Sequence, residues 1–313
     1  MLRTGCTSSS MDKSSGFSTI IILGAGAIGS YYGAILSQSC KVLLVGRRAH
    51  VESIRKKGLI LTGSINQTFH PEISTEIVDV PENCLIIVTT KASDTEEAIN
   101  GVKELLKPDS TVLVLQNGLG NEEVVRGLVD PRVSVVRGLT STGVEFLAPG
   151  RIDVKLLTET ILPATSSGKR IKTVFKSCGL EVRLTDRMEY ELWRKLAMNC
   201  VINPLSAIFR VPDRDIAADS LRNVRKGIVE ECIRVAEREG VTLEPSLVEE
   251  ITVAAAAYSN VSSMCQDILR GRKTEIGFLN GTVVKLGKRH GIPTLVNGVI
   301  TDLIRFMEGK KWT

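Results

Sequence analysis

The sequence of 313 residues lacks several features that would assign it to a class at once. It has no apolar run approaching the roughly 18 residues that a membrane-spanning helix needs, so a membrane protein is excluded. Its three histidines, His50, His70 and His290, are isolated along the chain, so no metal site is expected. It has no long run of positive residues despite a net charge of +5, and nucleic acid is therefore not an expected partner.

The number and spacing of the cysteines also exclude two kinds of site. There are seven, an odd number, widely spaced and without a Cys-x-x-Cys pair, which speaks against both a disulfide framework and a zinc site. Residues 1–18 are rich in serine and contain no apolar segment, so they are not a secretory signal. We expect a flexible leader at 1–18 and a cytoplasmic protein, with organelle import by this leader as the alternative. A homodimer is compatible with the sequence but not specified by it.

A chain of this length is too long for one ordinary core and about right for two domains. Its first half alternates short apolar runs with amphipathic stretches, as βαβ units do. Buried parallel strands are expected at Thr19–Leu23, Val42–Val45, Leu85–Thr89, Thr111–Leu115 and Val133–Val136. Covering helices are expected at 96–106 and 122–128. The predicted fold class is α/β, with a doubly wound parallel sheet.

The second half has a different texture. Short strand-like pieces continue from 144 to 184, and we expect them to complete the sheet in antiparallel fashion. Asp186-Arg187-Met188-Glu189 then has the pattern of a helix-capping box. Helical periodicity follows at 187–209, 219–239, 245–257, 260–270, 274–290 and 296–308. The expected organisation is a cofactor domain at 19–186 and an all-helical C-terminal domain at 187–313.

The first strand leads directly into Gly24-Ala25-Gly26-Ala27-Ile28-Gly29, which opens a helical stretch. Gly24 is expected to make the tight turn, Gly26 to let a pyrophosphate approach the backbone, and Gly29 to let helix and strand pack closely. Free N–H groups at the helix N-terminus favour a phosphate. This context indicates a dinucleotide-binding, Rossmann-type domain, with cofactor contacts along the whole segment.

The residues after the second strand distinguish between the two nicotinamide cofactors. An NAD enzyme places Asp or Glu there, to bond the ribose 2′-hydroxyl. Here the strand ends in Gly46-Arg47-Arg48, and guanidinium groups suit a 2′-phosphate. The expected cofactor is NADP with Arg47 as a ligand, and the alternative is that both arginines are solvated loop residues.

Three polar residues interrupt the apolar helix expected at 187–209. Lys195, Asn199 and Asn203 recur at i, i+4 and i+8, so they share one helix face. Buried polar groups are costly without partners, and core packing gives no reason for this stripe. We interpret it as part of a site in which an ammonium protonates a carbonyl oxygen and amides orient the substrate. The alternative is an ordinary solvated face.

Further polar residues complete this hypothesis. Asn260 and Ser263 begin a second stripe, and Glu275 follows at the expected start of the next helix. Lys91 and Asn117 come directly after predicted strands, where the ligands of an open α/β sheet bind. Taken singly, each of the last two is better explained as a turn residue.

At these residues the sequence resembles the ketopantoate reductase family (2-dehydropantoate 2-reductases). The matching segments are GAGAIG at 24–29, TTKA at 89–92, QNGLGNEE at 116–123, ELWRKLAMNCVINPLSAI at 191–208 and NVSSMCQDILRGRKTEIGFLNG at 260–281, together with Arg47. The resemblance implies NADPH-dependent reduction of ketopantoate to pantoate, a step toward pantothenate. It also implies a cleft between a Rossmann domain and a helical domain.

The resemblance implies a role for each candidate residue. Lys195 is similar to the family's general acid, and Glu275 to the acid that supports it and the substrate. Asn117 resembles the residue that bridges nicotinamide and substrate. The remaining ligands implied by the resemblance are Arg47 and Lys91 for the cofactor, Asn199 and Asn203 for the hydroxyl end of the substrate, and Asn260 and Ser263 for its carboxylate.

Three alternatives stay open at this point. One is a reductase of another small 2-oxo acid on the same fold. A second is a β-hydroxyacid dehydrogenase, which also carries a Lys-x-x-x-Asn helix but does not account for the segment at 260–281. The third is a non-catalytic NADP-binding sensor, since a fold alone never establishes catalysis. Lys195 and Glu275 speak against a sensor.

Overall fold

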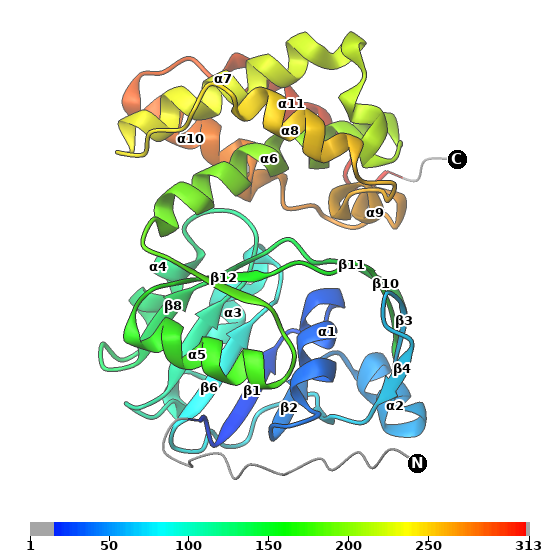
Figure 1. Ribbon diagram of the computed structural model, residues 1–313, viewed down its shortest axis with the longest axis vertical. Coiled ribbons are helices and arrows are strands. Elements are labelled where there is room, and N and C mark those ends of the chain that lie inside the picture. Colours follow the sequence, from blue (N-terminus) through cyan, green and yellow to red (C-terminus); the bar gives the residue numbers. More distant parts are fainter. Residues whose placement is uncertain (1–15, 311–313) are drawn as a thin grey trace, which may run out of the picture.

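The computed structural model describes residues 16–310, so most of the leader expected at 1–18 lies outside the described residues. A parallel sheet of six strands forms the centre of the N-terminal half (Figure 1). Its order is β5-β2-β1-β6-β7-β8. The strands are β1 (Thr19–Leu23), β2 (Val42–Val45), β5 (Glu72–Ser74), β6 (Cys84–Val88), β7 (Thr111–Val114) and β8 (Ser134–Arg137). All five strands predicted from the apolar runs are present, each within one residue of its expected bounds, and β5 is an addition.

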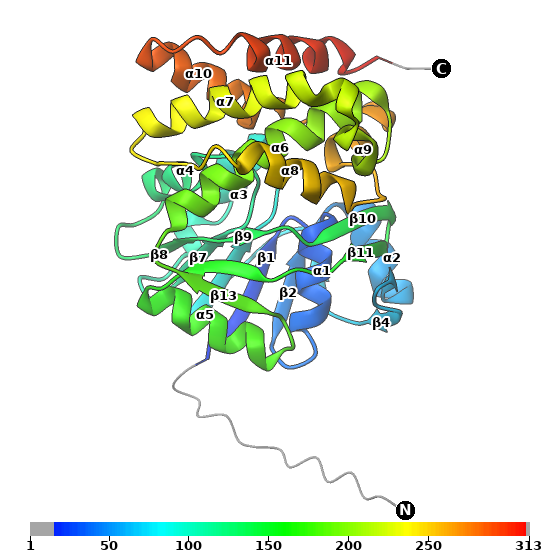
Figure 2. The ribbon, with the colours of Figure 1, turned by 45° about the horizontal axis from the view of Figure 1, so that its top comes forward.

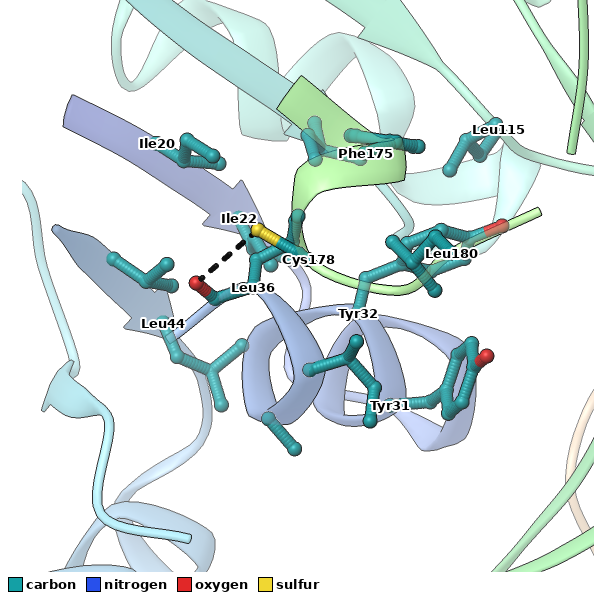
Figure 3. Close-up of a cluster of buried hydrophobic side chains, with 14 of the residues drawn as sticks. Ile20, Ile22, Tyr31, Tyr32, Leu36, Leu44, Leu115, Phe175, Cys178 and Leu180 are labelled. Atoms are coloured by element: carbon teal, nitrogen blue, oxygen red, sulfur yellow. Dashed lines mark hydrogen bonds between the residues drawn. The ribbon is translucent and has the colours of Figure 1, made fainter. Parts of the chain in front are cut away.

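Helices cover both faces of this sheet. They are α1 (Ala27–Leu36), α2 (Arg48–Lys57), α3 (Thr95–Asn100), α4 (Asn121–Leu128) and α5 (Ser166–Ser177). On one face, Tyr32 of α1 and Phe175 of α5 pack over the strands with their ring centroids 5.6 Å apart (Figure 3). The Tyr32 hydroxyl also lies 2.7 Å from Thr160 Oγ1, so its polar end has a partner inside the core. The helix predicted at 96–106 is shorter than expected, because a 3₁₀ turn at 103–105 replaces its second half.

The expectation that 144–184 completes the main sheet is wrong. These residues enter two separate sheets, ordered β10-β11-β3-β4 and β13-β12-β9. The strands of these two sheets are β3 (Leu59–Gly63), β4 (Gln67–Phe69), β9 (Leu139–Thr140), β10 (Gly143–Ala148), β11 (Arg151–Leu156), β12 (Thr160–Pro163) and β13 (Val182–Thr185). β11 pairs in parallel with β3, which lies far away in the sequence. This pairing buries Ile152 and Val154 of β11 completely, and their burial explains why the strand pairs there and not with the main sheet.

The sequence reasoning also missed helix α5 within this region. Its apolar residues Ile171, Val174 and Phe175 recur at helical spacing and face the core. Thr165 caps the helix by accepting a hydrogen bond from Gly168 N at 3.2 Å.

The C-terminal part is helical and lies against one end of the sheet region (Figures 1 and 2). Its helices are α6 (Met188–Phe209), α7 (Arg222–Arg238), α8 (Leu247–Ala256), α9 (Ser263–Leu269), α10 (Asn280–His290) and α11 (Leu295–Met307). They enclose a second hydrophobic core, separate from those of the sheet. Within residues 16–310, no helix is both long enough and apolar enough to cross a membrane.

The capping box predicted at 186–189 is absent. Helix α6 begins at Met188, and its N-cap Arg187 makes no side-chain cap hydrogen bond. The Arg187 N–H instead donates to Thr185 Oγ1 at 3.1 Å. A turn closed by the last residue of β13 therefore replaces the expected cap.

Helix α6 contains an internal proline that another helix compensates. Pro204 has no N–H, so the carbonyl of Cys200 loses its partner within the helix. Asn280, the fully buried first residue of α10, donates from Nδ2 to Cys200 O at 3.0 Å. The same amide donates to Asn297 Oδ1 at 3.0 Å. The irregular turn of α6 is therefore completed by α10.

We predict that Asn280→Ala lowers the free energy of unfolding by about 2 kcal/mol, because it leaves a buried carbonyl without a donor. Urea denaturation measures this change. Adding Pro204→Ala should recover part of the loss, since the new N–H can bond Cys200 O within the helix. A double variant no more stable than Asn280→Ala would show that the carbonyl is not the cause.

Candidate active site

The glycine segment forms a tight strand-to-helix turn between β1 and α1. Gly24 has φ +103°, and a Cβ there would lie 2.7 Å from Thr90 N. A Cβ on Gly29 would lie 2.1 Å from Gly24 O. At Gly26, by contrast, a Cβ would meet nothing within 4 Å among the described residues. The turn thus needs glycine at Gly24 and Gly29, and it leaves the space above Gly26 open at the N-terminus of α1, which fits a pyrophosphate.

Arg47 is exposed at the N-cap of α2, directly after β2. Its neighbour Arg48 is engaged by Glu52 at 2.9 Å. Behind them His50 is buried, with Nδ1 accepting from Gly150 N at 2.9 Å and Nε2 lying 3.0 Å from Ser30 Oγ. Burial lowers the pKa of His50 to about 4, so it is neutral at physiological pH. This histidine, which the sequence reasoning missed, ties α2 to α1 and to the turn between β10 and β11.

Lys91 follows β6 and reaches across to the helical part of the chain. Its Nζ donates to Asp267 Oδ2 at 2.7 Å and to Lys273 O at 2.6 Å. The residue expected to bind the cofactor is therefore paired with α9 in this structure.

Asn117, from the sheet region, and Glu275, from the helical part, contact each other where the resemblance implies a cleft. Asn117 Nδ2 donates to Glu275 Oε2 at 3.3 Å, and Ala92 N donates to Glu275 Oε1 at 3.1 Å. Burial raises the pKa of Glu275, and the donors on Ala92 and Asn117 act in the opposite direction. Glu275 precedes a 3₁₀ turn at 276–278, and α10 begins only at Asn280.

Lys195 is half-buried on α6, and its Nζ donates to Thr140 O at 2.5 Å. The pKa of Lys195 is lowered to about 7, mainly by burial and also by the charge of Arg137, while the charge of Glu275 acts in the opposite direction. The structure thus places Lys195 within electrostatic reach of Glu275, which Asn117 contacts. An amine that titrates near neutrality can donate or accept a proton under physiological conditions.

The four remaining candidates fall into two pairs. Asn199 and Asn203 are half-buried on α6, and within residues 16–310 neither side chain forms a hydrogen bond, so both amides are available to a ligand. Asn260 and Ser263 differ from expectation, since α9 starts at Ser263 and Asn260 precedes it. Asn260 Nδ2 lies 3.4 Å from Asp213 Oδ2.

The cap of α9 explains this later start. The side chain of Ser262 accepts from Cys265 N at 3.1 Å and donates to Asn203 O at 3.1 Å. Ser263 is therefore exposed in the first turn of α9.

Two buried polar residues that the sequence reasoning passed over shape the loops after the strands. Gln116 is 4% exposed, and its Nε2 donates to Thr95 Oγ1 at 2.8 Å and to Thr90 O at 2.9 Å. Arg137 is 5% exposed at the end of β8. An arginine that ends the mostly apolar run VSVVR was the signal in the sequence.

Among the described residues, no group of three metal-ligating side chains is present.

A Rossmann-like sheet region with a glycine turn, joined to a helical region that contributes a lysine and a glutamate to the cleft, defines a pyridine-nucleotide-binding reductase fold. The family model described as "Ketopantoate reductase PanE/ApbA" matches residues 20–167. The model described as "Ketopantoate reductase PanE/ApbA C terminal" matches residues 187–308. The chain belongs to the ketopantoate reductase family, whose members are oxidoreductases.

Curated relatives agree with this assignment. The chain is similar to a 2-dehydropantoate 2-reductase from Pyrococcus horikoshii, with 33% identity over 92% of this chain and 97% of the relative. A 2-dehydropantoate 2-reductase from Archaeoglobus fulgidus is 31% identical over 92% of this chain and 97% of its own.

Solved structures share the whole architecture. A PanE/ApbA family ketopantoate reductase from Ralstonia eutropha matches with a TM-score of 0.86 and 32% identity, over 92% of this chain and 98% of that one. A D-mandelate dehydrogenase in a ternary structure with NADH and anilino(oxo)acetate matches with a TM-score of 0.84 and 28% identity, over the same shares of the two chains.

We predict that Lys195 titrates near pH 7, because burial and a neighbouring cation both favour its neutral form. NMR of the protein after reductive methylation of its lysines with ¹³C measures this pKa. Lys195→Arg removes one signal and so assigns it. A midpoint close to that of an exposed lysine, at about 10, would contradict the prediction.

Proposed function

We propose that this chain reduces 2-dehydropantoate (ketopantoate) to (R)-pantoate with NADPH, a step toward pantothenate. The observation that carries the proposal is the contact of Asn117 with Glu275, whose charge acts on the buried amine of Lys195. The relatives named 2-dehydropantoate 2-reductase support the choice of substrate.

Lys195 is the proton donor in this proposal. When bound, NADPH supplies the hydride that reduces the keto carbon. The Lys195 ammonium then protonates the carbonyl oxygen as negative charge develops on it. A pKa of about 7 suits this role, because a substantial fraction of the lysine is charged at neutral pH and the proton leaves readily. Glu275 favours the charged form of the lysine and so helps to keep it protonated.

The cofactor would be held mainly by the N-terminal part of the chain. The glycine turn at 24–29 would take the pyrophosphate, and exposed Arg47 would take the 2′-phosphate. Lys91 would first have to exchange Asp267 for a cofactor oxygen, since the two now form an ion pair. Asn117 would lie between the nicotinamide and the substrate.

The substrate would be held mainly by the helical part. Asn199 and Asn203, whose amides have no partner of their own within residues 16–310, would bond its hydroxyl end. Asn260 and Ser263 would bond its carboxylate near the N-terminus of α9, where helix N–H groups favour an anion. Because the two sets of ligands lie on different parts of the chain, binding both ligands would close the cleft.

A second candidate is the reduction of another 2-oxo acid, with an aromatic substituent. It is favoured by the similarity to D-mandelate dehydrogenase, whose structure also contains NADH in place of NADPH. The two candidates share the chemistry of the keto acid and differ in the group attached to it. Assays therefore have to compare substrates and cofactors side by side.

We predict that oxidation of NADPH, followed by its absorbance, is at least about tenfold more efficient with ketopantoate than with pyruvate or phenylglyoxylate. Phenylglyoxylate as the best substrate would favour the second candidate.

Lys195→Ala should lower kcat by about 10² to 10⁴, the usual contribution of a general acid, with little change in NADPH affinity. Turnover by Lys195→Ala within about threefold of wild type would remove the lysine from the chemistry.

Cofactor preference is tested separately at Arg47. Arg47→Ala should weaken NADPH binding by about 1.5–3 kcal/mol, the value of a charge-assisted hydrogen bond, and leave NADH binding nearly unchanged. Lys56→Ala is the matched control, because Lys56 is an exposed cation in the last turn of the same helix. Fluorescence titration with each cofactor measures both affinities. An equal loss for NADH and NADPH would refute the 2′-phosphate assignment.

A further inference from the structure

A buried arginine, Arg137, forms hydrogen bonds to the loop that carries Asn117. The Arg137 guanidinium donates to Gln116 O at 2.7 Å and to Gly118 O at 2.8 Å, so it bonds both neighbours of Asn117. The carbonyl of Asn117 itself accepts from Asn121 Nδ2 at 2.8 Å. Three successive carbonyls are therefore fixed by side chains, and the conformation of the loop is set from below.

The charge of Arg137 is only partly matched by carboxylates. Glu122 Oε2 on α4 lies 3.6 Å from Arg137 Nε, beyond hydrogen-bond distance, and neither atom has a hydrogen-bond partner among the described residues. The other carboxylates whose charges act on Arg137 are Glu123 of α4, Glu189 of α6 and Glu275. A guanidinium keeps its proton even when buried. A fixed positive charge thus lies within the electrostatic reach of the cleft.

We propose that Arg137 is a positioning residue for the reduction, which fixes Asn117 through its loop and sets the electrostatic environment of Lys195. The inference rests on the proposed function in taking Lys195 as the proton donor. Arg137 acts through Asn117 and Lys195, so its two effects can be separated by substitution. A lysine keeps the charge but not the two-pronged donor, whereas a glutamine keeps an amide donor but not the charge.

The electrostatic effect has a definite sign. The charge of Arg137 lowers the pKa of Lys195 in addition to burial, and Glu275 opposes both. Removing that charge should therefore raise the pKa of Lys195. A proton donor works while it is protonated, so the activity should persist to higher pH. A purely structural role for Arg137 predicts a lower rate at every pH and no shift of the pH at which activity is lost on the alkaline side.

The test compares Arg137→Gln and Arg137→Lys with wild type. The kcat/KM for NADPH-dependent reduction is measured across the neutral and alkaline range, and the titration of Lys195 is followed by ¹³C NMR. Arg137→Gln should move the alkaline midpoint upward by about one pH unit. Arg137→Lys should leave the midpoint in place and lower kcat/KM about tenfold, as expected for the loss of one charge-assisted hydrogen bond to the loop.

Arg126→Gln is the matched control. Arg126 also donates to a carbonyl of β8, Val135 O, at 2.7 Å, but it does not contact the Asn117 loop. It should change neither the midpoint nor kcat/KM. If Arg137→Gln does not fold, Arg137→Met replaces it, because methionine also removes the charge and fills part of the space of the aliphatic stem, and the midpoint should again move upward.

Each outcome decides one part of the inference. An unchanged midpoint in Arg137→Gln, or in Arg137→Met where that variant replaces it, refutes the electrostatic effect. Wild-type kcat/KM in Arg137→Lys refutes the effect on the loop. The NMR titration needs no turnover, so a wild type inactive on every 2-oxo acid would refute the proposed function while the shift of Lys195 in the variants still decides the electrostatic effect.

Discussion

The carboxylate of Glu275 is the contact on which the arrangement of the cleft depends. It belongs to the helical part of the chain, yet its hydrogen-bond donors, Ala92 N and Asn117 Nδ2, both come from loops after strands of the parallel sheet. Without it, the loops that follow β6 and β7 would have no shared partner across the cleft. The same carboxylate opposes the loss of the proton from Lys195, so one group both aligns the two halves and affects their chemistry.

The helical side of the site is built around helix α6 and its dependence on α10. Lys195, Asn199 and Asn203 lie on α6, and Pro204 interrupts the hydrogen bonds of that helix directly after Asn203. The donor that repairs the interruption, Asn280, lies shortly after Glu275 in the chain. The hydrogen bond from Asn280 to Cys200 O therefore links the helix of the proposed proton donor to the segment of its carboxylate partner. A rigid frame of this kind keeps catalytic groups in place without help from the ligand.

Local signals were readable from the sequence and long-range ones were not. The turn at Gly24 and the apolar strands were predictable because their patterns depend on adjacent residues. The absence of the helix cap at 186–189 was not, because α6 begins at Met188 after a turn in which Thr185, at the end of β13, accepts from Arg187 N. The run VSVVR could mark Arg137 as unusual but not show its role, because its partners, Gln116 and Gly118, lie about twenty residues away and meet it through the pairing of β7 with β8. The spacing of residues could suggest which groups gather at the cleft, but not which buried charge supports them.

The two halves of the cleft are also joined by an ion pair that can be given up at little cost. Lys91 and Asp267 lie 2.7 Å apart, and the lysine side chain is 37% exposed. An ion pair open to solvent contributes only about 0–1 kcal/mol, so a ligand oxygen that replaces Asp267 loses little by breaking it. The second pair across the cleft, Arg270 with Glu145 at 2.9 Å, is similarly open to solvent. The contact between Arg270 and Glu145 is exposed, whereas those of Glu275 and of Lys91 with Asp267 are part-buried, so the Arg270–Glu145 pair is the one that costs least to break when ligands enter and leave.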